Sequence, residues 1–300
     1  MKPKLLYKKN GSSTPVSSYN RSGVYKIERT ESEGQPWSLM VRYDAGESDK
    51  SCIVVFPGYR MRVAQGFIGN QISQKFNDAG FPVLAIDYGG FTDSKSPAYD
   101  QATMSTNIRD ASCALSFLNV SSRIELSFSY GINISAQMDP HNRDAIVGVI
   151  PAPDIVHNKV VPIKPSMVSE QDNGQTILWY KRGSLALKCT EQFLKDSMQY
   201  STLGGLSSCT QQSRIALIAG ELDHLYSVDE LRAWGETLRK NGLDVDLNVL
   251  EGVGHRFNSC LVDASFSSVQ RVLSELSQVR RALQDVKPAQ SCETLEAMTA

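Results

Sequence analysis

Short, uninterrupted apolar runs recur along this chain, and segments with the apolar spacing of a helix lie between them. Residues 52–56 form the first run, which stops at Pro57-Gly58, and residues 82–87 form the second. Such runs are typical of strands that are buried on both faces of a sheet. Residues 64–78, between the two runs, place apolar side chains at helical spacing. The three segments together predict one strand-helix-strand unit.

The same alternation continues towards the C-terminus. Further strands are expected at 123–128, 145–150, 214–219 and 245–250, and helices at 102–118, 131–138, 228–241 and 264–283. Strands that alternate with helices favour parallel pairing, because the helix carries the chain back across the sheet. We therefore predict an α/β fold with a doubly wound, mostly parallel sheet.

The alternation breaks after Pro151-Ala152-Pro153, where polar loops flank a segment, residues 179–200, that we expect to be helical. An insertion over the edge of the sheet accounts for this break. N-terminal leader strands are expected in residues 1–50, one or two of them around residues 24–27, and a core in two pieces, residues 51–151 and 210–285. A small cap insertion is expected at residues 152–209 and a flexible tail at residues 286–300.

Composition excludes several classes of protein and of partner. Hydrophobic residues make up 41% of the 300 residues and charged residues 21%, enough for a packed core, so the chain is neither disordered nor a disulfide scaffold. Lys and Arg number 31 against 32 Asp and Glu, for a net charge of -1. Because no overall positive field exists, neither nucleic acid nor an anionic membrane is an expected partner.

Cysteine spacing and the N-terminus complete these exclusions. The six cysteines contain no CxxC pair and no histidine at ligand spacing, so we expect reduced thiols, no metal and no redox cofactor. The apolar residues near the N-terminus give way at once to Lys8, Lys9 and Asn10, so a signal-peptide core is missing. No segment has the length of a membrane span, and we expect a cytoplasmic protein.

A serine stands at a predicted strand-to-helix junction. The residues Ser127-Phe128-Ser129-Tyr130-Gly131 place Ser129 between small residues two positions before and after it. This is the nucleophile-elbow pattern, in which small neighbours allow a sharp turn between strand and helix, although here a serine replaces the first glycine. A helix N-cap is the alternative role for Ser129. The pattern makes Ser129 a candidate nucleophile.

A carboxylate and a histidine follow two later predicted strands. Asp223 comes after residues 214–219, and His255 lies in a glycine-spaced loop after residues 245–250. The carboxyl ends of parallel strands meet at one edge of a sheet, so Ser129, Asp223 and His255 can converge there in the chain order of this type of hydrolase. His255 would accept the serine proton and Asp223 would orient the imidazole. Glu221 and Asp229 are rivals for the acid, and a plain loop position is the alternative for His255.

Two further elements would complete a site. Gly58 and Tyr59 follow the first buried strand, where a backbone N–H could help bind an oxyanion, and Tyr130, directly after the serine, would supply the second N–H. Gly58 could equally be a simple turn glycine. Trp179 in the insertion is a candidate wall of a substrate pocket. His224 adjoins Asp223 and is expected to be a supporting or surface residue rather than the base.

These motifs together resemble the α/β-hydrolase superfamily over residues 50–275. Within it, the chain is most similar to the acyltransferase (thioesterase) component of the bacterial luminescence fatty-acid reductase complex. The shared features are the turn at 58–62, the Asp87 strand end with its Gly/Ser loop through Asp93-Ser94, the helix start at 103–105, and an elbow whose first glycine is replaced by a small residue. Gly131, where that subfamily tends to have serine, and residues 153–209 depart from it.

The resemblance implies that an acyl group passes from a thioester, on acyl carrier protein or coenzyme A, through an acyl-serine to water or another acceptor. A carboxylesterase, lactonase, peptidase-like hydrolase or carbon-carbon bond hydrolase could use the same three side chains. A non-catalytic ligand-binding relative is the remaining hypothesis, although a pure binder needs none of them. The sequence does not indicate acyl length, acceptor or oligomeric state.

Overall fold

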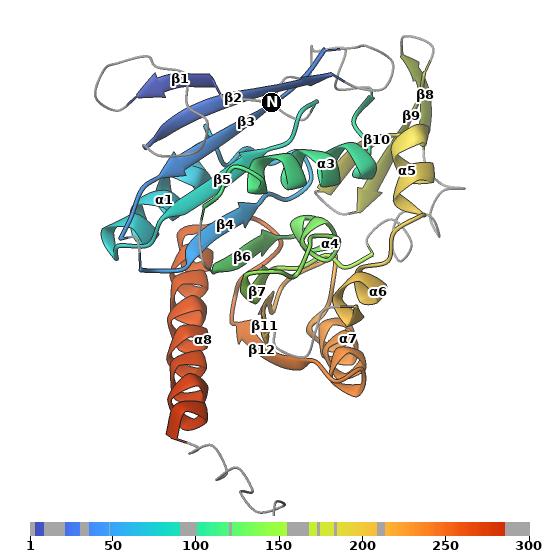
Figure 1. Ribbon diagram of the computed structural model, residues 1–300. Coiled ribbons are helices and arrows are strands. Elements are labelled where there is room, and N and C mark those ends of the chain that lie inside the picture. The colour runs from blue at the N-terminus through green and yellow to red at the C-terminus, as the bar shows by residue number, and fades with distance from the viewer. Residues whose placement is uncertain are drawn as a thin grey trace, which may run out of the picture.

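The computed structural model describes residues 4–8, 22–30, 36–47, 49–90, 101–119, 122–154, 168–172, 175–182, 185–208 and 214–285. Nine described strands form the main sheet. In sheet order they are β1 (Lys4–Lys8), β2 (Gly23–Thr30), β3 (Pro36–Asp44), β5 (Val83–Asp87), β4 (Cys52–Phe56), β6 (Arg123–Phe128), β7 (Arg143–Val149), β11 (Arg214–Gly220) and β12 (Asp244–Leu250) (Figure 1).

Pairing in this sheet changes direction once. From β5 to β12 every neighbouring pair is parallel, whereas β1, β2, β3 and β5 pair antiparallel. The predicted, mostly parallel sheet is therefore confirmed, with an antiparallel extension at one edge. β1, β2 and β3 lie within residues 1–50, where leader strands are expected, and β2 covers residues 24–27. The carboxyl ends of the parallel strands share one edge, which is where ligands bind in open sheets of this kind.

Helices cover both faces of the sheet (Figure 1). They are α1 (Phe67–Asp78), α3 (Met104–Leu115), α4 (Gly131–Ser135), α5 (Glu191–Ser197), α6 (Thr202–Ser207), α7 (Val228–Lys240) and α8 (Ser259–Asp285). In β4, Ile53 and Val55 belong to a core cluster shared with α1 and α8, while Val54 and Phe56 belong to one shared with α3, α4 and α5. Successive strand residues point to opposite faces, so a strand covered on both sides must be apolar throughout. This explains the apolar run in the sequence.

Between β7 and β11 the chain forms a second, three-stranded antiparallel sheet with β9 in its centre. Its strands are β8 (Val168–Asp172), β9 (Gln175–Arg182) and β10 (Leu185–Thr190). The expectation of a helix over residues 179–200 is wrong for its first half, because only Glu191–Ser197 is helical. Thr176, Ile177, Trp179 and Tyr180 are residues that favour strands, and Gly183-Ser184 is a two-residue hairpin sequence.

The boundaries 152–209 for a cap insertion stay a prediction, as do those of the other parts. Asp93, Ser94 and the tail from residue 286 lie outside the described residues. The final helix begins at Ser259, five residues before the expected start at residue 264. No described helix is both long and apolar enough to cross a membrane.

Candidate active site

Ser129 lies in a sharp turn between β6 and α4. Its φ is 47°, a left-handed value that is costly for a residue with a side chain. Backbone hydrogen bonds impose this geometry: Ser129 N–H donates to the carbonyl of Val149 at 3.0 Å, and the N–H of Ala152 donates to the carbonyl of Ser129 at 3.1 Å. A non-glycine residue held in this way is characteristic of a functional position, and it is the geometry that the pentad predicted.

The small residues on either side of Ser129 have a steric reason. A Cβ built at Gly131 would lie 2.4 Å from the main-chain oxygen of Phe56, so no side chain fits there. Ser127 is fully buried between Phe56 of β4 and Gly148 of β7, and its hydroxyl has no hydrogen-bond partner among the described residues. The position thus accepts a small side chain but gives its hydroxyl nothing to bond.

His255 contacts both of the other candidate residues. Its Nε2 lies 2.7 Å from Oγ of Ser129, and its Nδ1 lies 2.7 Å from Oδ2 of Asp223. The histidine side chain is only 8% exposed and the aspartate side chain is fully buried. Three residues that are far apart in the sequence therefore form one hydrogen-bonded chain, with the imidazole between hydroxyl and carboxylate.

Asp223 is held in place by the backbone around it. Its Oδ1 accepts hydrogen bonds from the N–H groups of Leu225 at 2.8 Å and Tyr226 at 3.3 Å, so Oδ2 is left for His255. A Cβ at Gly220, just before this turn, would lie 2.4 Å from the carbonyl oxygen of Val253. The close approach of the two backbones brings the aspartate turn against the loop that carries His255.

The rival carboxylates point elsewhere. Glu221 accepts a hydrogen bond from Gly252 N–H at 2.9 Å, on the outside of the histidine loop. Asp229 is 88% exposed and pairs with Arg232 at 2.9 Å. The ring of His224 lies edge-on to that of His255 with centroids 6.3 Å apart, beside the hydrogen-bonded chain rather than in it. Of these acids, Asp223 is the one in contact with the imidazole.

The segment between β4 and α1, residues 57–66, is named the oxyanion loop here, for the role that the sequence predicts for Tyr59. A Cβ at Gly58 would lie 3.4 Å from both the Cβ of Ser129 and the carbonyl oxygen of Phe128. The loop therefore brings Gly58, and with it Tyr59, next to Ser129. Tyr130, the other expected N–H donor, directly follows the serine and is the N-cap of α4.

The side chains of the two tyrosines form an aromatic cluster with Phe193 of α5. The ring of Tyr59 packs edge-on against Tyr130 at 5.8 Å and against Phe193 at 5.1 Å. Burial raises the pKa of both phenols well above the ordinary tyrosine value, so both stay neutral and neither serves as an acid or a base near neutral pH. The cluster connects the oxyanion loop to the insertion.

Asn133 is a contact point that the sequence analysis missed. Its side-chain amide donates to the carbonyls of Tyr130 and Ala152, both at 2.9 Å, while its oxygen accepts from Asp154 N–H and from the hydroxyl of Thr202. It thus fastens the helix after the serine to both ends of the insertion. An asparagine inside a short helix of otherwise small and apolar residues is the signal that could have drawn attention to it.

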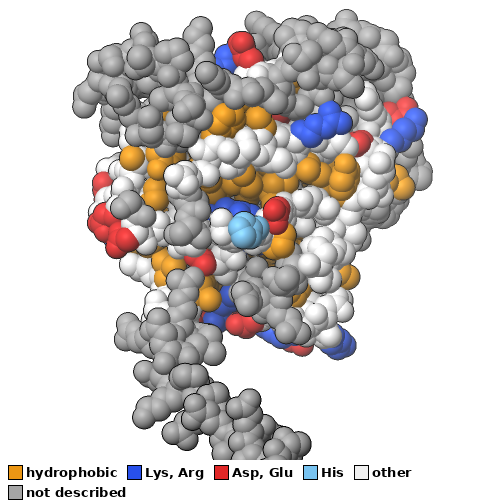
Figure 2. All heavy atoms as spheres, viewed as in Figure 1, with side chains coloured by type: hydrophobic (Ala, Val, Ile, Leu, Met, Phe, Trp, Pro, Cys, Tyr) orange, Lys and Arg blue, Asp and Glu red, His pale blue; other side chains and the backbone are white. Residues whose placement is uncertain are grey.

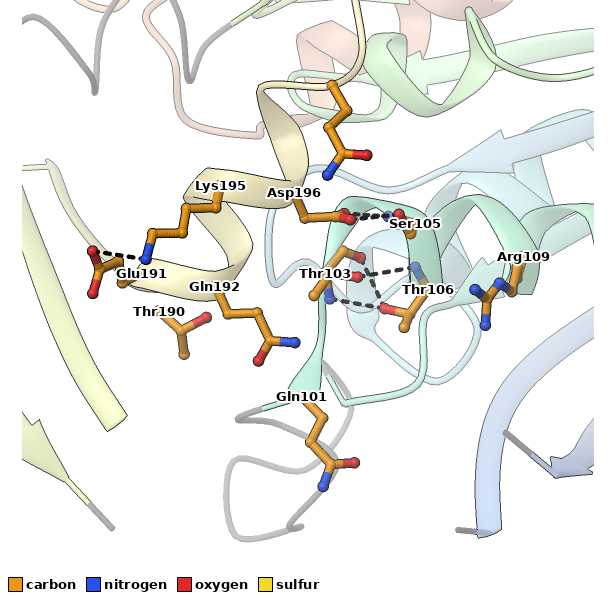
Figure 3. Close-up of a pocket in the computed structure, with 11 residues that line it drawn as sticks. Gln101, Thr103, Ser105, Thr106, Arg109, Thr190, Glu191, Gln192, Lys195 and Asp196 are labelled. Carbon is orange, nitrogen blue, oxygen red and sulfur yellow. Dashed lines mark hydrogen bonds and ion pairs between the residues drawn. The ribbon is translucent and has the colours of Figure 1, made fainter. Parts of the chain in front are cut away.

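A polar cavity of about 670 Å³ lies where the insertion meets α3 (Figure 3). Asp196 of α5 accepts hydrogen bonds from the backbone N–H of Ser105 at 2.7 Å and from its hydroxyl at 2.6 Å, which joins the two helices beside the cavity. None of Ser129, Asp223 and His255 lines this cavity. It is therefore separate from the candidate catalytic residues.

The remaining expectations concern Trp179 and the absence of a metal. Trp179 lies in β9, but its side chain is outside the described residues. Among the described residues, no group of three or more His, Cys, Asp and Glu side chains is arranged to hold a metal ion. On the face drawn in Figure 2, hydrophobic side chains gather beside the visible histidine.

Comparisons by sequence find nothing: no protein-family model matches the chain, and no curated protein matches it. Comparison by structure finds many solved proteins. Among them are a candidate hydrolase from Agrobacterium vitis (TM-score 0.67, 14% identity) and mouse alpha/beta hydrolase domain-containing protein 10 (TM-score 0.64, 16% identity). A third is Est1E from Butyrivibrio proteoclasticus with ferulic acid bound (TM-score 0.60, 14% identity).

Each of these three alignments covers 84% of this chain and 99% of the other. Identities this low carry information about fold alone, but the near-complete coverage of the other chains means that their whole architecture is present here. The parallel sheet, the elbow after β6 and the structural neighbours agree, and on these grounds this chain has the α/β-hydrolase fold.

Proposed function

We propose that this protein is a serine-dependent acyl hydrolase or acyltransferase that works through an acyl-serine intermediate on Ser129. The observation that carries the proposal is the pair of 2.7 Å contacts by which His255 joins Ser129 to Asp223. A serine hydroxyl is a poor nucleophile unless a base takes its proton. In this proposal His255 takes the proton, and Asp223 orients the imidazole and stabilises its charged form.

In the first half of the reaction, Oγ of Ser129 attacks the carbonyl carbon of the substrate while its proton passes to Nε2 of His255. The carbonyl oxygen becomes negatively charged, and the N–H groups of Tyr59 and Tyr130 are the proposed donors to it. The loss of one such donor costs about 10²- to 10³-fold in turnover in a serine protease. The C–O or C–S bond then breaks, and the leaving group takes the proton from His255.

In the second half, an acceptor removes the acyl group from Ser129. His255 takes a proton from water or from another hydroxyl or thiol, whose oxygen or sulfur attacks the ester carbonyl. The tetrahedral intermediate collapses, and His255 returns a proton to Oγ of Ser129. Water as acceptor makes the protein a hydrolase, and any other acceptor makes it a transferase. The three side chains serve both reactions equally.

Exposed apolar side chains near the same edge of the sheet support an acyl substrate. Phe67, the first residue of α1 after the oxyanion loop, is 74% exposed, and Leu222, next to Asp223, is 63% exposed. Both follow the carboxyl ends of parallel strands, where the candidate active site lies. Large apolar groups exposed beside a site are candidates for contact with an apolar part of the substrate.

We further propose that the acyl group arrives as a thioester, on acyl carrier protein or coenzyme A, in the cytoplasm. This rests on the resemblance in sequence to the luminescence acyltransferase, which includes Gly58-Tyr59-Arg60 and Asp87. A carboxylesterase is the second candidate. It is favoured by Est1E, whose structure holds ferulic acid and whose fold this chain shares. Trp179 and Gly58 are proposed substrate contacts in either case.

Labelling with a fluorophosphonate tests the nucleophile. The wild-type protein should incorporate one probe on the peptide that contains Ser129, and Ser129→Ala should abolish both labelling and turnover. Ser127→Ala is the matched control, because it removes a hydroxyl two residues away that is fully buried. Labelling that never occurs, or that survives in Ser129→Ala, would leave a non-catalytic ligand-binding protein as the better description.

A substrate panel then ranks the two candidate functions. Acyl thioesters of increasing chain length and the matching p-nitrophenyl esters should be compared by kcat/KM, each with and without a hydroxyl acceptor. The thioester proposal expects higher kcat/KM for thioesters than for esters of the same acyl group. Turnover of short esters with no thioesterase activity would refute the thioester substrate while leaving the role of Ser129 intact.

A further inference from the structure

The oxyanion loop needs an anchor to hold Tyr59 beside Ser129. Within the loop, the N–H of Met61 donates to the carbonyl of Gly58 at 3.1 Å and closes a tight turn, in which Arg60 has a φ of 59°. That turn defines the local shape of the loop, but it does not fix the position of the loop relative to the sheet. A displacement of about 1 Å at such a position can cost about 100-fold in rate.

The anchor is a buried carboxyl on the neighbouring strand. Asp87 is the last residue of β5, which pairs with β4, and is 1% exposed. Its Oδ1 accepts hydrogen bonds from the backbone N–H groups of Val63 at 2.5 Å and Ala64 at 2.9 Å. Two successive residues of the oxyanion loop are thus bonded to one oxygen atom at the end of the adjacent strand.

Burying this carboxyl costs free energy. Burial raises the pKa of Asp87 above its ordinary value, although the backbone N–H groups that it accepts act in the opposite direction. Its second oxygen, Oδ2, is buried and bonds to no described residue. Asp110 is a second buried carboxylate, which accepts hydrogen bonds from Trp37 Nε1 and from the backbone N–H of Gly89.

We propose that Asp87 is a positioning residue of the acyl-transfer reaction, which sets the backbone N–H of Tyr59 at the distance from Ser129 that the oxyanion requires. The inference rests on the proposed function, because it assigns to Asp87 a role in stabilising the oxyanion of that reaction. Asp87 acts only through the loop and does not touch the substrate. A costly buried group is expected where it serves a function that packing alone does not provide.

Asp87→Ala removes the acceptor, and Asp87→Ser leaves an oxygen on a side chain too short to reach the N–H groups of Val63 and Ala64. Asp87→Asn keeps an oxygen at the Oδ1 position. We expect kcat per active site, counted by fluorophosphonate titration, to fall about 100-fold in the alanine and serine variants with KM within about threefold. The affinity for a trifluoromethyl ketone, which forms a tetrahedral adduct, should fall by the same factor. Asp87→Asn should retain kcat within about threefold, and the serine variant serves if the alanine variant does not fold.

Asp110→Ala is the control for the loss of a buried carboxyl, and its kcat per active site should match the wild type. Amide hydrogen exchange supplies a readout that does not depend on activity: residues 57–66 should exchange faster in Asp87→Ala and not in Asp110→Ala. Unchanged kcat or exchange in the alanine and serine variants, a change in KM alone, or an equal loss in Asp87→Asn would overturn the inference. Turnover that survives Ser129→Ala would instead overturn the proposed function.

Discussion

Gly131 lies so close to Phe56 that a Cβ on the glycine would come within 2.4 Å of the main-chain oxygen of Phe56. This contact lets α4 start two residues after Ser129 and pack against the end of β4. Because the obstacle is backbone rather than a movable side chain, neither partner can yield cheaply.

Gly131→Ala should therefore lower the free energy of unfolding by about 2–3 kcal/mol, within the range for overpacked cores, and should also reduce turnover by displacing Ser129. Gly204→Ala in α6 is the control, since its Cβ would meet Ser201 at an ordinary 3.4 Å. That variant should be neutral or stabilising by about 0.5–1 kcal/mol, because alanine has the higher helix propensity. Denaturant titration with an assay at each step checks both results.

Asp223→Asn should leave the fold intact and reduce kcat by about 10³- to 10⁴-fold. The asparagine oxygen can still accept from Leu225 and Tyr226, but the side chain no longer carries the charge that favours the imidazolium. The controls are Glu221→Gln and Asp229→Asn, which alter the neighbouring carboxylates and should keep kcat within about twofold. A larger loss in either control than in Asp223→Asn would reassign the acid.

The hydrogen bonds between Asp196 and Ser105 join the insertion to α3, and a substitution at Asp196 removes them. Asp196→Ala should lower the free energy of unfolding by about 1–2 kcal/mol, since it removes a partly buried carboxylate that accepts a backbone N–H near the start of α3. Lys195→Ala breaks only the exposed pair with Glu191 and should cost about 0.5 kcal/mol or less. Equal stabilities for the two variants in urea would contradict this role.

Thiol reactivity should follow burial. Burial raises the pKa of Cys189 to about 11 and that of Cys52 to about 12, whereas Cys260 is exposed. At pH 8, iodoacetamide should modify Cys260 and spare the other two in the folded protein, as peptide mass mapping would show. Cys260→Ser should remove that site of labelling.

The same pKa shifts set a direction for stability at high pH. In the unfolded chain the thiols of Cys52 and Cys189 ionise near their ordinary pKa of 9.0, whereas in the folded protein they ionise only at higher pH. Ionisation at high pH therefore favours the unfolded state. Stability contributed by Cys52 and Cys189 is complete below about pH 9 and is lost as the pH rises towards 11 or 12. The free energy of unfolding should be measured at pH 8 and at pH 10 for the wild type and for Cys189→Ala. Its decrease between the two pH values should be smaller in Cys189→Ala than in the wild type.

Local sequence patterns were sufficient to predict most strands of the core. Residues 52–56 and 82–87 were expected as buried strands because a strand covered on both faces must be apolar at every position, and β4 and β5 are such strands. The turn at Ser129 was expected because the small neighbours on each side of it are a local requirement. The strands β9 and β10 were missed, although residues that favour strands were visible in the sequence.

The spacing of residues along the chain thus predicts which segments become buried strands and helices, and in what order the chemical groups follow their ends. The contact of His255 with Asp223, rather than with Glu221 or Asp229, and the reach of Asp87 to Val63 and Ala64 become visible in the folded chain alone. Those contacts depend on the approach of separate backbones, such as Gly220 to Val253, and no residue spacing within one segment encodes that approach.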